Sequence, residues 1–426
     1  MLRPRSPQPQ PPALPASGEA SAAAAGTGAR RATLVSDRRF TRCASPTLTA
    51  RKISTYTVLG FTGYAVASLT GAGLAMTWEL TLGERLIGLL VPPIAFLVAV
   101  MIASAAAHRE RIVFYQAAIP AVLATALVAA IAGVRVARLV DLAALGIGTF
   151  LVFGRLGCFA VACCHGTLGR GRFAITYGAT HVRAGFWPRW EGRALWPVQL
   201  IESAASGVLV VAGILAAGTP GTAAVVYIVG YGALRFALEG VRGDAARPYL
   251  LGVSEAQWLA LASCAACAVW RPHPLAIAAA AGLAIATAVL VARRDRRALV
   301  LPPHLHELDR VVARVLADPA HGRRETSRGL AVSCYPMPDG KIDWVWSSAH
   351  PAWSPAIARQ LATALWRDPV VVEGRAPGIL HVLVPHSTPF PAPSAGRLPL
   401  PLPPAPPAPA PPAAAPAEIE DDLRLN

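Results

Sequence analysis

Long apolar runs dominate the middle of the chain and predict a bundle of membrane-spanning helices. A helix needs about 20 residues to cross the ~30 Å hydrocarbon of a bilayer. The runs that approach this length are 54–78, 86–107, 112–134, 139–153, 200–217, 223–238, 258–270 and 275–292. Pro92-Pro93 interrupts the second run, and the last two are short and separated by a polar stretch, 271–274. The sequence therefore predicts seven or eight crossings within residues 53–297.

The pattern changes on both sides of these runs. Residues 1–52 are rich in Pro and Ala and then in Arg, without the compact apolar core of a signal peptide, and predict a disordered basic arm. At the other end, residues 387–426 carry a Pro/Ala tract that predicts an extended, disordered tail.

Residues 298–386 have the patterning of a small soluble domain. Apolar and polar residues alternate along 329–335 and 342–346, on either side of an Asp339-Gly340 turn, which predicts a β-hairpin. Helical periodicity at 306–317 and 357–366 and a further strand at 379–384 complete a domain that we expect to fold by itself. The predicted fold class is an all-α polytopic membrane bundle of seven or eight transmembrane helices with a small C-terminal α+β soluble domain.

Composition and charge support a membrane protein. Hydrophobic residues make up 54% of the chain and charged residues only 15%, against about 25% in an ordinary soluble protein. The net charge of +15 lies mostly in the tails and short loops. Because long uncharged apolar runs lie beside the basic residues, this charge favours anionic lipid headgroups over nucleic acid.

An arginine follows the fourth apolar run, in the sequence Gly154-Arg155-Leu156-Gly157-Cys158-Phe159. A charge at that depth costs about 2.5–3.5 kcal/mol, so it calls for a counter-ion, and a lipid phosphate is one candidate. Gly154 and Gly157 would let a ligand or another backbone approach closely. The alternative is an arginine that snorkels from a helix end.

A second polar group lies on the predicted sixth helix. Tyr231, Arg235, Glu239 and Arg242 fall on one helical face, where shared polar residues at membrane depth indicate a site. The alternative is a packing stripe with an Arg235–Glu239 pair. Glu202, one turn into the helix that begins near Pro197, needs an arginine partner for the same reason.

The spacing of the cysteines along the chain does not indicate a regular disulfide framework. They stand at positions 43, 158, 163, 164, 264, 267 and 334. Cys264 and Cys267 lie inside an apolar run and are interpreted as packing residues. Cys163-Cys164-His165 lacks the second ligand pair of a structural zinc site, so we expect no metal there and no cofactor. We also expect no covalent relay at Cys158, Cys163 or Cys164, because a relay thioether would have to be broken at carbon with an alkyl thiolate as a poor leaving group.

Taken together, the motifs resemble a divergent, cysteine-containing branch of the prolipoprotein diacylglyceryl transferase family of bacterial membranes. The resemblance rests on G-R-x-G-C-F at 154–159, P-x-Q-L-x-E at 197–202 and Y-G-x-x-R-F-x-x-E-x-x-R at 231–242, with Tyr56 at the opening of the first span. It covers about residues 53–292 and neither tail. It implies a multi-pass protein of the bacterial cytoplasmic (inner) membrane, with the 163–197 loop outside the cytoplasm.

The resemblance implies transfer of a diacylglyceryl group from phosphatidylglycerol to the thiol of the lipobox cysteine of a lipoprotein precursor. The implied catalytic residues are Arg155, Arg235, Tyr231 and Glu239. The implied lipid- and phosphate-binding residues are Arg155, Arg235, Arg242, Tyr56, Gly154, Gly157, Gln199 and Glu202. Its partners would be the phospholipid and the precursor, without nucleic acid.

The chain departs from the family at the groups that would handle a proton. Tyr115-Gln116 stands where the family often has His-Gly, and Trp196 replaces a histidine, which leaves His165 as the candidate base. Two other function classes therefore remain open. One is a non-catalytic lipid-binding or assembly protein that retains the fold. The other is a small-solute transporter, which would favour inverted repeats that the sequence does not show.

Overall fold

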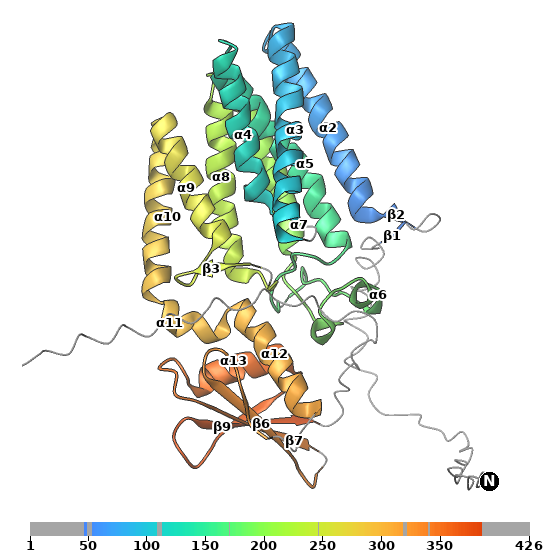
Figure 1. Cartoon of the computed structure of the whole chain (residues 1–426), viewed down its shortest axis with the longest axis vertical. Helices are drawn as coiled ribbons and strands as arrows, with labels where there is room; N and C mark the ends of the chain where they lie inside the picture. Colours follow the sequence, from blue (N-terminus) through green and yellow to red (C-terminus); the bar gives the residue numbers. More distant parts are fainter. Residues whose placement is uncertain are drawn as a thin grey trace, which may run out of the picture. The chain divides into compact units, whose positions relative to one another are not determined.

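The computed structural model describes residues 47–48, 53–108, 113–169, 171–245, 247–317, 322–339 and 341–385 (Figure 1). The predicted basic arm and Pro/Ala tail lie outside the described residues, apart from the short strand β1 (Thr47–Leu48), which pairs with β2 (Ile53–Ser54). The bundle and the C-terminal domain belong to one compact unit.

Antiparallel helices form the membrane bundle, as the apolar runs predict (Figure 1). They are α2 (Thr55–Thr77), α3 (Leu82–Ala107), α4 (Phe114–Ile131), α5 (Val136–Ala160), α7 (Val198–Leu215), α8 (Thr222–Leu238), α9 (Glu255–Trp270) and α10 (Pro274–Ala292). Among the described residues, seven helices are long and apolar enough to cross a membrane. The remaining member, α9, has 16 residues. The chain is a multi-pass membrane protein.

Two glycine contacts show that α9 also runs the length of the bundle. Gly252 precedes α9, and a Cβ at Gly252 would lie 2.8 Å from Cβ of Arg294, just after α10. Gly221 precedes α8, and a Cβ there would lie 2.9 Å from Nε of Arg271, just after α9. The helices α8, α9 and α10 therefore alternate in direction, and the helices that the structure describes traverse the bundle eight times.

Helices α3 and α5 differ clearly from what the sequence predicts. Helix α3 is continuous through Pro92 and Pro93, so the predicted interruption there was wrong. A proline in a membrane helix is tolerated where neighbouring structure satisfies the freed backbone groups. Helix α5 continues to Ala160 instead of ending near residue 153, which places Arg155 inside the helix. The apolar run stops earlier because the last turns carry a charge and two glycines.

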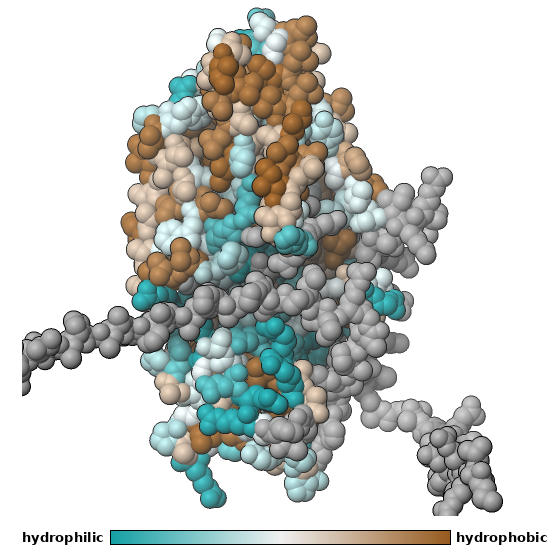
Figure 2. Space-filling model, viewed as in Figure 1, coloured by the Kyte–Doolittle hydropathy of each residue, from teal (hydrophilic) through white to brown (hydrophobic). Residues whose placement is uncertain are grey.

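Helix α5 is the centre of the bundle. Sixty-one per cent of its most apolar window is buried, against 11% for α3, and it packs against α2, α4, α7 and α8. The outer helices carry their large apolar side chains outward, for example Leu86, Leu97 and Met101 on α3. Figure 2 shows such apolar side chains gathered over the bundle. An apolar surface of this extent suits lipid and not water.

The C-terminal domain is a five-stranded antiparallel sheet with two helices. The strands β5 (Arg324–Glu325), β6 (Leu330–Pro336), β7 (Lys341–Ser348), β8 (Val370–Glu373) and β9 (Ile379–Pro385) are arranged in the order β5-β6-β7-β9-β8. The helices are α12 (Pro302–Ala317) and α13 (Pro355–Leu365). The predicted hairpin, helices and last strand are confirmed, while β8 was missed because its three consecutive valines do not alternate.

The connections between these elements are short, except for the segment between α5 and α7. That segment contains α6 (Ala179–Arg183) and η1 (Pro188–Trp190). The other short elements are η2 (Glu239–Val241), β3 (Tyr249–Leu250), β4 (Val253–Ser254), α11 (Arg294–Arg297) and η3 (Ala298–Val300).

The C-terminal domain docks on the α5–α7 segment. Asp309 on α12 accepts a hydrogen bond from Nε1 of Trp187, 2.7 Å away, and forms an ion pair with Arg189. Nε1 of Trp190 donates to the backbone oxygen of Ala364 at the end of α13, 3.0 Å away. These contacts agree with eight crossings, because they place the domain at the end of the bundle where α5 finishes.

Candidate active site

A cluster of buried charges lies where α5, α7 and α8 meet the α5–α7 segment. Its centre is Glu202, in the second turn of α7. The Oε1 atom of Glu202 lies 2.9 Å from Nη2 of Arg155 and 3.7 Å from Nε of Arg235. Its Oε2 atom lies 3.8 Å from Nη1 of Arg242. Arg155 and Arg235 are therefore brought together on one carboxylate, although they are 80 positions apart in the sequence.

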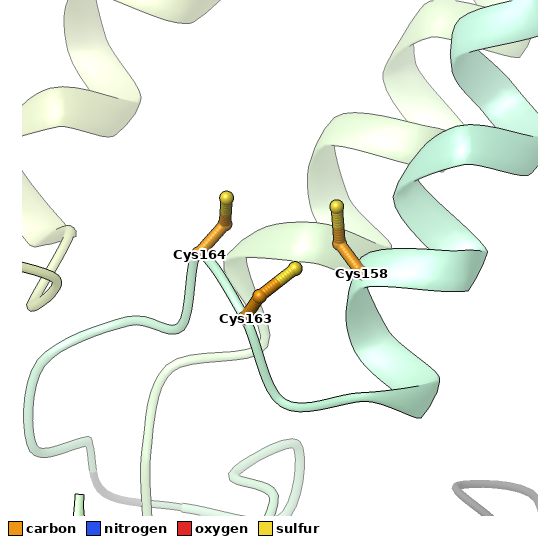
Figure 3. A group of neighbouring side chains, drawn as sticks. All are labelled: Cys158, Cys163 and Cys164. Atoms are coloured by element: carbon orange, nitrogen blue, oxygen red, sulfur yellow. The ribbon is translucent and has the colours of Figure 1, made fainter. Parts of the chain in front are cut away.

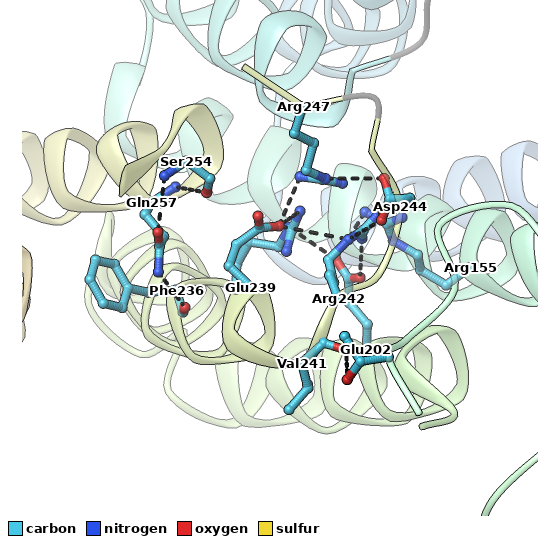
Figure 4. Close-up of polar contacts among 12 residues, drawn as sticks. Arg155, Glu202, Phe236, Glu239, Val241, Arg242, Asp244, Arg247, Ser254 and Gln257 are labelled. Atoms are coloured by element: carbon cyan, nitrogen blue, oxygen red, sulfur yellow. Dashed lines mark hydrogen bonds and ion pairs between the residues drawn. The ribbon is translucent and has the colours of Figure 1, made fainter. Parts of the chain in front are cut away.

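The cluster continues beyond α8 through a second layer of ion pairs (Figure 4). Glu239 pairs with Arg235 one turn before it and, at 2.8 Å, with Nη1 of Arg247. Asp244 lies 2.9 Å from Nη2 of Arg242 and 3.3 Å from Nε of Arg247. Although burial opposes ionisation, Arg242 and Arg247 hold the pKa of the Asp244 carboxyl below its ordinary value.

The cluster carries more positive than negative charge. Four guanidinia face three carboxylates, an excess of one positive charge among the described residues. The side chains of Arg155 and Arg235 are only 7% and 2% exposed. A buried excess charge is costly, so the arrangement favours a bound anion.

Two guanidinium N–H groups point to where that anion would bind. Within the described part of the chain, neither Nε of Arg155 nor Nη1 of Arg235 has a hydrogen-bond partner, although both are buried. Buried donors are almost always paired in folded proteins. Arginine donors match the oxygens of phosphate well. Each of the two groups could therefore donate to an oxygen of a bound phosphate.

Tyr231 fixes the central carboxylate. Its hydroxyl donates to Oε1 of Glu202 at 2.7 Å. Its ring stacks on Tyr227, with centroids 5.9 Å apart, and contacts the ring of Tyr115, with centroids 5.8 Å apart. The Tyr115 hydroxyl is buried and has no hydrogen-bond partner among the described residues. Tyr231 thus acts on the arginines through Glu202.

The glycines beside Arg155 differ in what they contact. A Cβ at Gly157 would lie 2.9 Å from Cδ2 of Tyr56, so glycine lets α2 approach α5 there. A Cβ at Gly154 would meet nothing within 4 Å. Close approach is thus confirmed for Gly157 and Tyr56, and Gly154 faces open space.

Gln199 holds the segment after α5. Its Nε2 atom donates to the backbone oxygen of Cys163 at 2.8 Å and to the Tyr177 hydroxyl at 3.2 Å. His165 packs edge-on against Phe186 and Trp190, and burial lowers the pKa of its imidazole. Neither Gln199 nor His165 has a direct contact with the arginines of the cluster in the described contacts.

Three cysteines gather at the end of α5. The sulfur atoms of Cys158, Cys163 and Cys164 all lie within 4.8 Å of one another (Figure 3). The sequence predicted no metal at Cys163-Cys164-His165, because nothing in it indicated that the chain turns back and brings Cys158 to the same place. Cys264 and Cys267 are buried in the bundle, as the packing interpretation requires.

A cavity of about 620 Å³ lies between the charge cluster and the C-terminal domain. Glu239, Arg242 and Tyr249 line it on the bundle side, and Arg297 and Arg359 on the other. Neither Arg155 nor Arg235 lines it. The cavity gives the cluster an opening toward the side where the C-terminal domain lies.

The sequence analysis missed Asp244, Arg247 and Tyr177. Asp244 and Arg247 follow the end of α8, where charged residues are ordinary and carry no signal of burial. Tyr177 lies in the α5–α7 segment and is 1% exposed. The spacing of Arg242, Asp244 and Arg247 could have indicated a charge-paired turn.

A sequence profile described as prolipoprotein diacylglyceryl transferase matches residues 76–271. These residues belong to the prolipoprotein diacylglyceryl transferase family. The match spans α3 to α9 and includes every member of the charge cluster. No curated protein matches the chain. Membership of this transferase family connects the protein with diacylglyceryl transfer in lipoprotein maturation.

Proposed function

We propose that the protein transfers a diacylglyceryl group from phosphatidylglycerol to the cysteine thiol of a lipoprotein precursor, forming a thioether at the outer face of a bacterial inner membrane. The observation that carries this proposal is the pair of unpartnered, buried N–H groups on Arg155 and Arg235. The two arginines belong to different helices, share the Glu202 carboxylate through their other nitrogen atoms and lie in a cluster with one excess positive charge. A phosphodiester headgroup fits these requirements.

The reaction needs stabilisation of charge that grows on phosphate. The acceptor sulfur attacks the glycerol carbon of the diacylglyceryl group, the carbon–oxygen bond to phosphate breaks, and glycerol phosphate leaves with the electron pair. Guanidinia held in place by Glu202 and Glu239 need no reorganisation as that charge develops. Arg155 and Arg235 therefore contact the phosphate, and Glu202, Glu239 and Tyr231 position them.

The remaining members of the predicted site surround this pair. Arg242 links the cluster to the cavity, and Tyr56 lies against the last turn of α5. Gln199 fixes the segment after α5, so its effect on lipid binding is through the backbone of Cys163. The diacyl chains would extend along the apolar surface of the bundle.

The test is transfer by the purified full-length chain in lipid nanodiscs. Labelled phosphatidylglycerol and a lipobox peptide are supplied, and lipidated peptide is quantified by mass spectrometry. Arg155→Ala and Arg235→Ala should each lower the rate by at least about 10²-fold, the usual effect of losing a charge-stabilising donor. Arg85→Ala, at the opposite end of the bundle, is the matched control.

Two results would contradict the proposal. Wild-type chain that binds phosphatidylglycerol without lipidating the peptide would identify a non-catalytic lipid-binding protein. Arginine variants that remain inserted and folded, and react as fast as Arg85→Ala, would show that the cluster is only a packing element.

A further inference from the structure

The cysteine group at the end of α5 has no role in the transfer described above. Cys158 is buried and Cys163 is exposed, so the group lies at a boundary between the bundle and the outside. Cys158 follows Arg155 by three residues on α5, which places the two side chains on neighbouring positions of one helix face. Cys158 is thus within about one helical turn of Arg155 along α5.

The way α5 ends explains why two of the cysteines meet. The N–H of Cys163 donates to the oxygen of Cys158 at 3.1 Å, and the N–H of Ala162 donates to the oxygen of Phe159 at 3.3 Å. These are the two bonds of a Schellman motif, in which the residue after the left-handed position contacts the residue five before it. Cys163 and Cys158 hold those two places.

The third cysteine is brought in by a second left-handed residue. Ala162 has φ 57° and Cys164 has φ 54°, where glycine is the usual residue. A non-glycine residue there costs about 1–2 kcal/mol. Two such positions within three residues, held by the bond from Gln199 to the Cys163 oxygen, keep all three sulfur atoms together.

We propose that Cys158, Cys163 and Cys164 bind one zinc ion whose fourth coordination position takes the thiol of the acceptor cysteine. Zinc bound by thiolates at about 2.3 Å separates the sulfur atoms by roughly 3.8 Å, so small side-chain rotations from the observed spacing suffice. Three protein ligands with an open fourth position are typical of catalytic zinc, and the exposure of Cys163 leaves a face open.

This proposal rests on the transfer function and supplies what that function lacks. No histidine belongs to the charge cluster as described, so the acceptor thiol has no evident base. A thiol that coordinates zinc is deprotonated, and its proton passes to water. Its sulfur then attacks the glycerol carbon. The carbon–sulfur bond forms, the carbon–oxygen bond breaks, and glycerol phosphate leaves beside Arg155 and Arg235. The thioether is a weaker ligand than a thiolate and dissociates.

Metal content of the full-length protein tests the site itself. The chain is purified under reducing conditions without chelators, and its metals are measured by inductively coupled plasma mass spectrometry. We expect about one zinc per chain. Cys158→Ser and Cys164→Ser should each lose at least nine tenths of it, and Cys264→Ser and Cys334→Ser should keep it. A wild-type chain with reduced cysteines and no bound metal overturns the site, and a different metal overturns the assignment to zinc.

Cobalt substitution tests the open position. Co²⁺ bound by thiolates gives visible absorption bands that change when a further thiolate binds. A lipobox peptide with its cysteine should change these bands, and the same peptide with serine should not. Absorption bands that change with neither peptide would show a closed structural site and overturn the proposed role. Bands that respond, in a protein that does not lipidate the peptide, would retain the thiol site and reject the transfer function.

Discussion

At the scale of single residues, Glu202 is the member of the cluster on which the others depend. It contacts Arg155, Arg235 and Arg242 from a fully buried position. Glu202→Gln keeps an oxygen for the Tyr231 hydroxyl but leaves the buried guanidinia without their shared counter-ion. We expect it to lower the free energy of unfolding by about 3–5 kcal/mol, measured by thermal or denaturant unfolding in detergent. Glu373→Gln on the exposed strand β8 is the control, and equal stability of the two variants would contradict the shared counter-ion.

Gly157 and Gly154 differ in what an added methyl group would contact. Gly157→Ala would place a methyl group 2.9 Å from the ring of Tyr56, whereas Gly154→Ala points into open space. Overpacking of this kind typically costs about 1–3 kcal/mol. We expect Gly157→Ala to lower both stability and transfer rate by moving α2 away from α5.

Gly154→Ala should leave both properties close to wild type, since alanine is also the better helix former. Melting temperature and transfer are measured on the two variants side by side. If both substitutions behave alike, the contact between Tyr56 and the last turn of α5 does not matter to the site.

The sequence could predict those site residues whose charged side chains are energetically costly to bury. Arg155, Arg235 and Glu202 stand in apolar surroundings, so each calls for a partner, and the structure places them together. Asp244 and Arg247 could not be found this way. The proximity of the three cysteines could not be predicted from the sequence either. A Schellman motif is normally indicated by a glycine, and here Ala162 takes the place of that glycine.

At the scale of elements, apolar length predicted the helices well and their ends less well. Helix α5 runs past the apolar run because charge pairing inside the bundle permits Arg155 in its last turns. Helix α3 runs through Pro92 and Pro93 although prolines usually mark a break. Both errors have one cause. A hydropathy pattern reports on the medium around a helix, but neighbouring helices decide where a charge or proline is tolerated.

We expect the contact between α12 and the α5–α7 segment to be sensitive to pH through His306. The imidazole stacks on Trp187 with centroids 3.9 Å apart, and burial lowers its pKa to about 4, although Asp309 and Asp244 oppose the shift. An unfolded histidine has a pKa near 6.5. The folded form therefore binds fewer protons, and its stability is complete above pH 6.5 and falls as pH drops toward 4.

We expect this loss to be at most about 3 kcal/mol. It should appear as faster proteolysis of the α5–α7 segment at pH 5 than at pH 7.5, with a protease active at both values. His306→Gln, which cannot titrate, should remove most of the difference. A pH response that is unchanged in His306→Gln would assign it to another group.

At the scale of the whole molecule, composition predicted a membrane bundle and a soluble domain but left the number of crossings open. Helix α9 is short and follows a polar turn, so hydropathy alone fits either a span or an interfacial piece. The contacts of Gly252 and Gly221 decide it, because they show which helix ends are neighbours. The hydrogen bond from Trp190 to Ala364 then holds the C-terminal domain against the α5–α7 segment, next to the charge cluster.

Eight crossings predict that the α5–α7 segment and the C-terminal domain lie on the same side of the membrane. Epitope tags inserted after Arg183, in that segment, and after Asp339, in an exposed turn of the domain, should be cut together when protease is added to vesicles of known orientation. A tag after Gly218, in the connection between α7 and α8, lies at the opposite end of the bundle and should be protected. With seven crossings the Asp339 tag would instead be protected with the Gly218 tag. That result would also separate Asp309 from Arg189, so it would reject both the docked domain and the cavity between Arg242 and Arg359.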